Sequence, residues 1–310
     1  MREPIDYILK REKMNQFAGK TAVISGGGEG IGLSIAKALG EQQMNIVLAD
    51  IDAGNLRKAS AELEQAGVPV LAVTLDVAEE AQWQEVARQA LDRFGSIHML
   101  INNAGVGGES GSIENQNAQS WEWTVNVNLM GVVFGAKVLV PLIKEHGDGG
   151  WLVNVASMAG MGGVPYGGAY SATKSAVVAL SEGWAGELKS DGIAVSILCP
   201  AFVQTRIYDS QRNRQTRYQS DGPESSYRAK STDKSGMLGK AKAAVQNGID
   251  ASIVGKRLVE ALSAGELYVF THPNYRPVVQ YRAKMIDAAF ERAAQSPLLQ
   301  DIVNQKIDML

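Results

Sequence analysis

The sequence contains few of the residues that form cross-links and metal sites. Its only cysteine, Cys199, excludes an intrachain disulfide and fits a reducing compartment. The three histidines, His98, His146 and His272, form no HExxH motif and have no cysteine at ligand spacing, so we expect no metal site. A GxSxG nucleophile elbow is also missing, because the nearest match, GLSIA around Ser34, lies within an expected helix.

Excess charge and long apolar runs are missing as well. The formal net charge of −3 gives no reason to expect nucleic acid or an anionic membrane as a partner. No run reaches the roughly 18 uninterrupted apolar residues that span a membrane. The N-terminal stretch MREPIDYILKREK is charged throughout and lacks the apolar core of a signal peptide. We therefore expect a cytoplasmic protein.

Short β-branched runs alternate with amphipathic stretches of helix length along most of the chain. The expected strands are 21–25, 45–50, 70–76, 98–104, 150–157, 193–199 and 266–270. The expected helices lie near 30–42, 53–66, 79–94, 117–146, 168–190, 249–263 and 274–294. Most of the strands are continuously apolar, as in a parallel sheet that is covered on both faces. The pattern predicts an α/β fold, a Rossmann-type doubly wound parallel sheet of about seven strands with helices on both faces.

The same pattern suggests the domain boundaries. We expect an N-terminal extension over 1–17 and a single catalytic domain over 18–310. Within this domain, 206–248 is polar, basic and without a clear strand, which predicts a substrate loop or lid. The alternative for this segment is a solvated insertion with no specific role. A helical tail over about 274–310 is expected to pack on the domain or on a partner subunit.

A glycine-rich stretch, SGGGEGIG at 25–32, follows the first strand and opens the first helix. Its spacing is GxxxGxG. Glycines at this position allow a tight turn and let a diphosphate approach backbone N–H groups at the helix N-terminus. The stretch therefore predicts a dinucleotide site, and the residues that we expect to contact the cofactor are Gly26, Gly28, Glu29, Gly30 and Ile31.

Asp50 ends the second strand at the right distance from the glycine loop to accept hydrogen bonds from the adenosine ribose. Its carboxylate would repel a 2′-phosphate, no lysine or arginine stands at 49, 51 or 52, and Glu29 adds a second negative charge. We therefore predict NAD as the cofactor, with Ile51 beside the ribose and Asp76 and Val77 at the adenine edge. Alternatively, Asp50 is a solvated residue at a strand end.

An ordered series of motifs continues from the glycine loop. After DV at 76–77 come NNAG at 102–105, VNLMG at 127–131, NVAS ending at 157, YSATK at 170–174 and CPAFVQT at 199–205. Through these motifs, residues 18–205 closely resemble the short-chain dehydrogenase/reductase family, in its compact single-domain branch. One departure is Ala201, where the family usually has glycine.

The resemblance implies a catalytic set. Tyr170 would be the general acid/base and Lys174, one helical turn on, would lower the phenol pKa and hold the nicotinamide ribose. A unit positive charge at about 4 Å supplies on the order of 4 kcal/mol of electrostatic stabilisation to the phenolate. This energy equals a lowering of the phenol pKa from about 10 to about 7. Ser157 would stabilise charge on the substrate oxygen, and Asn128 would hold a relay water, with Asn126 as a competing choice. The alternative for Tyr170 and Lys174 is an ordinary surface pair.

The resemblance also implies the remaining contacts and the assembly. Further cofactor contacts are expected from Asn103, Ala104, Gly105, Pro200, Val203 and Thr205. The expected substrate pocket contains Ser157, Tyr166, Tyr170 and Phe202. In this family the helices near 117–146 and 168–190 commonly form a subunit interface, so we expect a homodimer or homotetramer.

Together these features predict an NAD(H)-dependent oxidoreductase that interconverts a secondary alcohol and a ketone. The C-terminal stretch is similar to that of family members acting on bulky secondary alcohols, including Cα-dehydrogenases of lignin-derived aryl ethers, and hydroxysteroids are equally compatible. The small-molecule substrate is thus expected to be a bulky hydrophobic or aromatic alcohol. Two alternatives stay open, a non-catalytic NAD(H)-binding sensor or scaffold and an NADPH-dependent carbonyl reductase.

Overall fold

The structure of the protein is a computed structural model that describes residues 16–219 and 237–306. Its contacts divide into two compact units, one that ends at Thr271 and one that begins at His272. We expected one domain from 18 to 310, and the C-terminal segment is instead a unit of its own. Most of the expected N-terminal extension, residues 220–236 of the expected loop and residues 307–310 of the expected tail lie outside the described residues.

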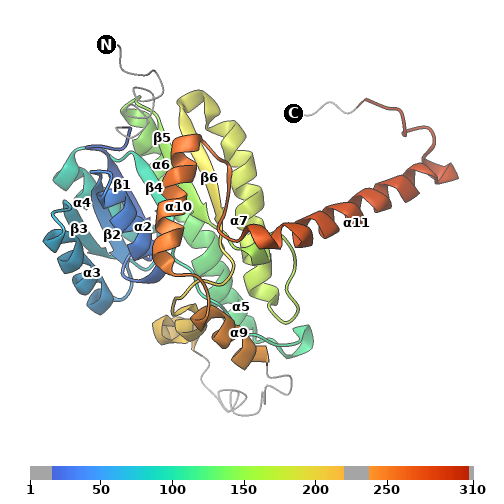
Figure 1. Cartoon of the computed structure of the whole chain (residues 1–310), viewed down its shortest axis with the longest axis horizontal. Helices are drawn as coiled ribbons and strands as arrows, with labels where there is room; N and C mark the ends of the chain where they lie inside the picture. Colours follow the sequence, from blue (N-terminus) through green and yellow to red (C-terminus); the bar gives the residue numbers. More distant parts are fainter. Residues whose placement is uncertain (1–15, 220–236, 307–310) are drawn as a thin grey trace, which may run out of the picture. The chain divides into compact units, whose positions relative to one another are not determined.

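A parallel sheet forms the centre of the first unit (Figure 1). In the described part of the chain it has seven strands in the order β3-β2-β1-β4-β5-β6-β7, and every neighbouring pair is parallel. The strands are β1 (Thr21–Ser25), β2 (Asn45–Asp50), β3 (Val70–Thr74), β4 (Met99–Asn102), β5 (Gly150–Val155), β6 (Ile193–Cys199) and β7 (Tyr268–Phe270). This is the doubly wound order, so the predicted Rossmann-type fold is confirmed.

Helices cover both faces of the sheet and create two apolar layers. The helices that pack into one layer are α2 (Gly30–Gly40), α3 (Ala53–Gln65) and α10 (Ala251–Ala264). Those that cover the other face are α4 (Glu80–Phe94), α5 (Ala118–Val125), α6 (Gly131–Glu145) and α7 (Gly168–Glu187). Because both faces are covered, every residue of β1 and β5 is buried, which explains their mostly apolar sequences.

Helices α2 and α10 approach each other closely because small residues lie where they meet. A Cβ on Gly255 would stand only 2.4 Å from the backbone oxygen of Ser34, so no larger residue fits there without movement. The Ser34 hydroxyl donates a hydrogen bond to the backbone oxygen of Ala251 at 2.5 Å. Ser34 thus holds two helices together, which agrees with the conclusion that GLSIA is no nucleophile elbow.

The long helix expected over 117–146 is interrupted. It consists of α5, a π-helical turn at Asn126–Met130 and α6. By length and composition the whole stretch Ala118–Glu145 could cross a membrane. In this fold, however, α6 packs against β4, β5 and α4, and part of its apolar residues belong to the protein core. A π turn offsets the side chains by one residue, and here it contains Asn128.

The polar segment that follows Thr205 has more structure than its sequence predicts. It forms two short 3₁₀ helices, η5 (Ile207–Asn213) and η6 (Thr216–Tyr218), and returns through α9 (Met237–Gln246). Its base is closed by a bridge in which Ile249 N–H donates to Phe202 O and Gln204 N–H donates to Ile249 O, at 3.1 and 2.9 Å.

The second unit consists mainly of helix α11 (Arg276–Ala294), flanked by short helices η8 (Pro273–Tyr275) and η9 (Pro297–Leu299). No residue of α11 is buried. Four of its large apolar side chains are more than half exposed, namely Val278, Tyr281, Met285 and Phe290. The helix expected at 274–294 is therefore present.

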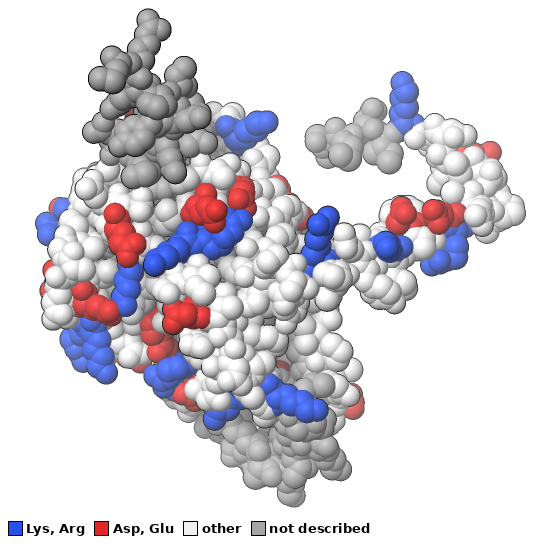
Figure 2. Space-filling view, viewed as in Figure 1, with Lys and Arg blue, Asp and Glu red and all other residues white. Residues whose placement is uncertain are grey.

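Charged side chains of both signs alternate over the surface. On the face drawn in Figure 2, the coloured Lys and Arg side chains lie beside Asp and Glu side chains rather than in one large area of positive charge. Ion pairs such as Lys37–Glu62 and Arg257–Glu266 account for part of this mixing.

Candidate active site

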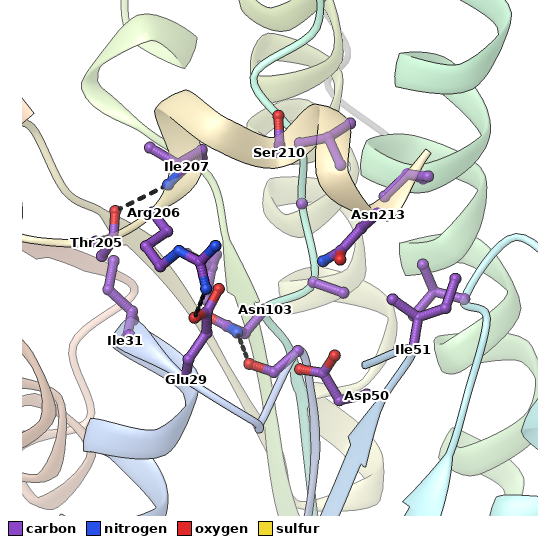
Figure 3. A pocket seen from close by; sticks show the side chains of 18 of the residues that line it. Glu29, Ile31, Asp50, Ile51, Asn103, Thr205, Arg206, Ile207, Ser210 and Asn213 are labelled. Atoms are coloured by element: carbon purple, nitrogen blue, oxygen red, sulfur yellow. Dashed lines mark hydrogen bonds and ion pairs between the residues drawn. The ribbon is translucent and has the colours of Figure 1, made fainter. Parts of the chain in front are cut away.

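A cavity of about 200 Å³ opens at the carboxyl ends of the strands, where the strand order reverses between β1 and β4. In parallel sheets this reversal leaves a crevice that ligands occupy. Asn103 spans it, because its Nδ2 donates to the backbone oxygens of both Ser25 and Gly26 at 2.9 Å. The Ser25 hydroxyl in turn accepts the N–H groups of Asn103 and Ala104. These bonds fix the glycine loop against the end of β4 (Figure 3).

Most of the expected cofactor residues line this one cavity. They are Gly26, Glu29, Gly30, Ile31, Asp50, Ile51, Asp76, Val77, Asn103, Ala104, Gly105, Pro200, Val203 and Thr205. Gly28 does not line it. Instead its N–H donates to the Asp50 carboxylate at 2.9 Å and so holds the turn in place.

The glycine loop lies so close to its neighbours that side chains would not fit. A Cβ on Gly26 would stand 2.9 Å from Ala104 Cα, and one on Gly32 would stand 2.1 Å from Gly26 O. Gly26 and Gly30 also have φ values of +63° and +58°, which favour glycine. The spacing GxxxGxG is therefore required by the backbone, and it leaves the N-terminus of α2 open to the cavity.

Asp50 is buried at the end of β2. Its two carboxylate oxygens accept the N–H groups of Gly28 and Asp52, each at 2.9 Å. Burial raises the pKa of this carboxyl group, and these hydrogen bonds oppose the shift. Asp50 thus fixes the glycine loop and also lines the cavity. The alternative interpretation of Asp50 as a solvated residue at a strand end is wrong.

Ser157, Tyr170 and Lys174 line the same cavity from β5 and α7. Ser157 follows β5; its hydroxyl donates to Pro200 O at 3.4 Å and lies near enough to Tyr170 to lower the pKa of the phenol. The Lys174 ammonium donates to Val155 O at 2.7 Å and lies 5.8 Å from the centre of the Tyr170 ring. Lys174 is only 4% exposed, so Tyr170 and Lys174 are not an ordinary surface pair.

The net effect of the protein's own groups is to raise the phenol pKa above its usual value. Burial raises the pKa of Tyr170, opposed by the hydrogen bond from Ser157, and Lys174 is not among the causes of the shift. Burial also lowers the pKa of Lys174 to about 8. The chain by itself therefore does not produce the expected lowering of the Tyr170 pKa: the Lys174 ammonium is bonded to Val155 O, and burial disfavours its charge.

The two asparagines of the π turn have different surroundings. Asn128 is fully buried; its Oδ1 accepts Val106 N–H at 2.7 Å, and its Nδ2 donates to Val106 O at 2.9 Å. A Cβ on Gly105 would meet both Asn128 Oδ1 and Lys174 Nζ at 3.4 Å, so these groups converge. Asn126 instead donates to the Tyr218 hydroxyl at 3.1 Å. The geometry favours Asn128 as the residue that supports the catalytic set, although it does not line the cavity itself.

Two expected substrate residues lie outside the cavity wall. Tyr166 and Phe202 are not among the residues that line it, and both are exposed, Tyr166 by 50%. Tyr166 has φ +64°, a left-handed conformation in the turn before α7, which directs the chain into that helix. Nothing in the spacing of the motifs indicates this turn. Ser157 and Tyr170 keep their expected places.

The largest contribution that the sequence motifs missed comes from the segment after Thr205. Its cavity-lining residues are Arg206, Ile207, Ser210, Arg212, Asn213 and Gln215. Arg212 and Arg206 both pair with Glu29, and Arg217 pairs with Asp76 and Glu79 at 2.7 and 3.0 Å. Glu29 is therefore charge-balanced, which corrects the expectation that it repels a 2′-phosphate. The signal for this arrangement was the basic composition of the segment.

A second group of titratable residues lies at the opposite, amino end of the sheet. His98, His146 and Asp148 bring their ligand-type atoms within 4.8 Å of one another. The Thr21 N–H donates to His98 Nδ1, and the Asp148 N–H donates to His146 Nδ1. His146 Nε2 therefore carries a proton and donates to Ile97 O at 2.9 Å. The Nδ1 atoms of both rings thus accept backbone N–H groups.

The buried ammonium of Lys174 predicts a pH-dependent stability difference. Its folded pKa of about 8 lies below the usual 10.5, so the unfolded chain binds more protons between these values. The stability of the wild type should therefore rise relative to Lys174→Met as the pH increases from 7 to 10, by about 3 kcal/mol at about 1.4 kcal/mol per pKa unit. Urea unfolding of both proteins at several pH values measures this difference.

The matched control is Lys137→Met, because Lys137 is an exposed lysine of α6. Its stability difference from the wild type should stay nearly constant with pH. Burial raises the pKa of Cys199 to about 12 and Lys174 opposes this rise, so the thiol of the folded protein stays protonated up to pH 10 with or without Lys174 and does not alter the comparison. A wild type that shows no gain over Lys174→Met with rising pH would contradict a buried, destabilised ammonium.

Comparison with known proteins agrees with the geometry. A sequence model described as short chain dehydrogenase matches residues 20–216. A dehydrogenase/reductase of CLA biosynthesis from Lactiplantibacillus plantarum is 34% identical over 88% of this chain and 95% of its own length. A C alpha-dehydrogenase from Sphingobium sp. is 29% identical over 85% of this chain and 84% of its own. A Burkholderia phymatum short chain dehydrogenase/reductase, solved in complex with NAD, is 34% identical with a TM-score of 0.82, covering 95% of this chain and 99% of that one. This chain belongs to the short-chain dehydrogenase/reductase family of oxidoreductases.

Proposed function

We propose that the protein is an NAD(H)-dependent dehydrogenase that interconverts a secondary alcohol and a ketone, with Tyr170 as the general acid/base. The observation that carries this proposal is the shared cavity. The glycine loop and Asp50 line one part of it, and Ser157, Tyr170 and Lys174 line another. A binding protein without catalysis has no use for a buried lysine beside a buried phenol, since both groups cost stability there.

The residues present fit a dinucleotide. Glycines at 26, 30 and 32 leave space that side chains would fill, and a Cβ on Gly30 would meet Thr205 Cγ2 at 3.2 Å. The N-terminus of α2 supplies unpaired N–H groups for a diphosphate, and the Asp50 carboxylate suits ribose hydroxyls. A nicotinamide cofactor supplies the hydride acceptor or donor and, when oxidised, a positive charge.

The chain's own residues transfer the proton of the substrate hydroxyl. In alcohol oxidation the Tyr170 phenolate accepts the hydroxyl proton, and the Ser157 hydroxyl donates to the substrate oxygen. The Lys174 ammonium, oriented by Val155 O, would favour the phenolate together with the positive charge of an oxidised cofactor. Asn128 keeps the π turn and the strand-end loop in register through its two bonds to Val106. In ketone reduction the same groups act in reverse.

We propose a bulky hydrophobic or aromatic alcohol as the substrate. Several apolar side chains line the cavity, including Val106, Trp123, Val127, Ile207 and Val245. Two relatives carry names of this kind, the C alpha-dehydrogenase and a 3-alpha-(or 20-beta)-hydroxysteroid dehydrogenase of Mycobacterium tuberculosis, 36% identical over 63% of this chain. Measuring NADH formation with a panel of aryl and steroid secondary alcohols tests this proposal.

Removing the phenol hydroxyl tests the proposed role of Tyr170. Tyr170→Phe should lower kcat about 10²- to 10⁴-fold, the usual range for losing a general acid/base, and leave the Kd for NADH nearly unchanged. Tyr166→Phe is the matched control, because Tyr166 lies four residues earlier and outside the cavity wall. Equal turnover of Tyr170→Phe and wild type would contradict the mechanism. A wild type that binds NADH and oxidises no alcohol would favour the sensor or scaffold alternative.

The choice between NAD and NADP depends on Asp50, because Glu29 is paired with Arg206 and Arg212. Asp50→Asn removes the buried negative charge and should raise the ratio of kcat/KM for NADP to that for NAD about 10- to 100-fold, equal to about 1.4–2.8 kcal/mol. A ratio of the two cofactors in one variant cancels any general loss of folded protein. A wild type that prefers NADP would favour the NADPH-dependent reductase alternative instead.

We also propose that copies of the chain associate through the helices at Ala118–Glu145 and α7. Within one chain, only 44% of the 18-residue apolar window in Ala118–Glu145 is buried. Apolar residues that stay exposed on a monomer in this way are typical of subunit interfaces. Light scattering should give a mass of two or four chains of 33.2 kDa. Val133→Glu in α6 should reduce this mass, whereas Ile113→Glu, in an exposed loop, should not. A monomeric wild type would refute the proposal.

A further inference from the structure

Two loops form part of the rim of the active-site cavity. The loop 107–117 begins directly after Val106, and the loop 158–167 begins directly after Ser157. Both Val106 and Ser157 line the cavity. The second loop also leads into the helix that carries Tyr170. Whatever covers these loops therefore lies beside the place where a substrate reaches the catalytic set.

The two loops are joined and present exposed apolar side chains. Gly111 N–H donates to Tyr166 O at 3.0 Å, which holds the loops side by side. Ile113 is 73% exposed, and Val164 and Tyr166 are each 50% exposed. We call these three side chains the rim patch. Exposed apolar side chains that gather at one place, and are not scattered singly, are typical of a contact surface.

Helix α11 has a wide apolar face. Val278, Tyr281 and Met285 share one side of the helix, at positions i, i+3 and i+7. Ile286 and Phe290 widen this face, and all five side chains are at least 43% exposed. No residue of α11 is buried within its own chain. Because most helices in proteins are stabilised by packing of such a face, α11 requires a surface from outside the chain.

The apolar surface of the second unit is large enough for a specific interface. Beyond α11, further exposed apolar side chains follow toward residue 306. The described part of this unit has nine large apolar side chains that are more than a third exposed, the last four being Leu298, Leu299, Ile302 and Val303. One side of a standard interface takes roughly 20–30 residues, a size that the unit from His272 onward reaches.

The charges of α11 and of the rim loops are opposite in sign. Helix α11 contains four basic and two acidic residues, whereas the two loops contain two acidic residues and no basic one. Arg282 lies beside the apolar face, four residues after Val278 and three before Met285. Glu114 is exposed and adjoins Ile113 in the rim patch. Charges arranged in this way favour one orientation of two surfaces more than they add affinity.

We propose that α11 of one copy covers the rim patch of a second copy and forms the outer wall of its substrate cavity. Each copy has one such helix and one rim patch, so two copies that exchange their helices cover both surfaces in both chains. Such reciprocal contacts are what a closed two-fold assembly requires. The contact itself is independent of the proposed function, whereas its effect on the substrate rests on the active site at Tyr170.

Cross-linking between two distinguishable copies tests the contact. A tagged chain with Ile113→Cys and an untagged chain with Phe290→Cys are co-expressed and treated with a short bismaleimide. We expect a covalent species of two chains, each of 33.2 kDa, that contains both forms. The native Cys199 is buried, and wild-type chains measure any background from it. The matched control replaces Phe290→Cys by Arg88→Cys, an exposed position of α4, and should give no such species.

A single chain with both Ile113→Cys and Phe290→Cys distinguishes a second copy from the same chain. A cross-link within this chain, together with none between singly substituted copies, would overturn the proposal, because α11 would then cover its own rim patch. The absence of a cross-link in both experiments would overturn it as well.

Substrate kinetics test the effect on the cavity. Tyr281→Glu should raise the KM for a bulky secondary alcohol about 10-fold, the factor typical of losing an apolar contact in a substrate pocket, and leave the Kd for NADH within about threefold. Gln280→Glu is the matched control, because it adds the same charge at the next residue on the opposite side of α11. It should keep the KM of the wild type.

The outcomes separate this inference from the proposed function. Copies that cross-link to each other and oxidise no alcohol would refute the proposed function and support the contact. Copies that oxidise alcohols and do not cross-link would overturn only the contact. Cross-linking with an unchanged KM in Tyr281→Glu would overturn the role of α11 as a wall of the substrate cavity.

Discussion

The hydrogen bonds between Ser25 and Asn103 join the ends of β1 and β4 at the point where the strand order reverses. In a parallel sheet the helices after these strands lie on opposite faces, so this point alone opens a crevice between them. Asn103 fixes the glycine loop from one side and Asp50 fixes it from the other through Gly28. The cofactor half of the site thus depends on side chains that bind backbone, not on the glycines alone.

The reacting half of the site places ionisable groups where burial disfavours their charged forms. Burial raises the pKa of Tyr170 and lowers that of Lys174. Each of these shifts reduces the stability of the folded chain when the group is charged, and the apolar layers on both faces of the sheet offset that cost. The protein's own groups therefore keep the phenol of Tyr170 protonated to a higher pH than in a free tyrosine.

The fold and the centre of the site could be predicted because their signals are local. A buried parallel strand is apolar along its length, a tight turn requires glycine, and Tyr170 and Lys174 are one helical turn apart. The missed features depend on residues that are distant in sequence. Glu29 and Arg212 are 183 positions apart, and no spacing rule links them. The left-handed turn at Tyr166 was missed for a different reason. Glycine is the residue that usually predicts a left-handed conformation, and a tyrosine gives no such signal.

The overall net charge of −3 does not describe the mouth of the cavity, where acidic side chains and arginines come from different parts of the chain. The acidic groups Glu29, Asp76 and Glu109 lie on three separate elements, and each pairs with an arginine of the segment after Thr205. Each of these ion pairs contributes little to stability where solvent reaches it, but one short segment makes all three together. The wall of the cofactor cavity and the loop that follows Thr205 are consequently the same piece of chain. A change that alters substrate preference in this segment would therefore disturb the cofactor as well, unless it spares the arginines.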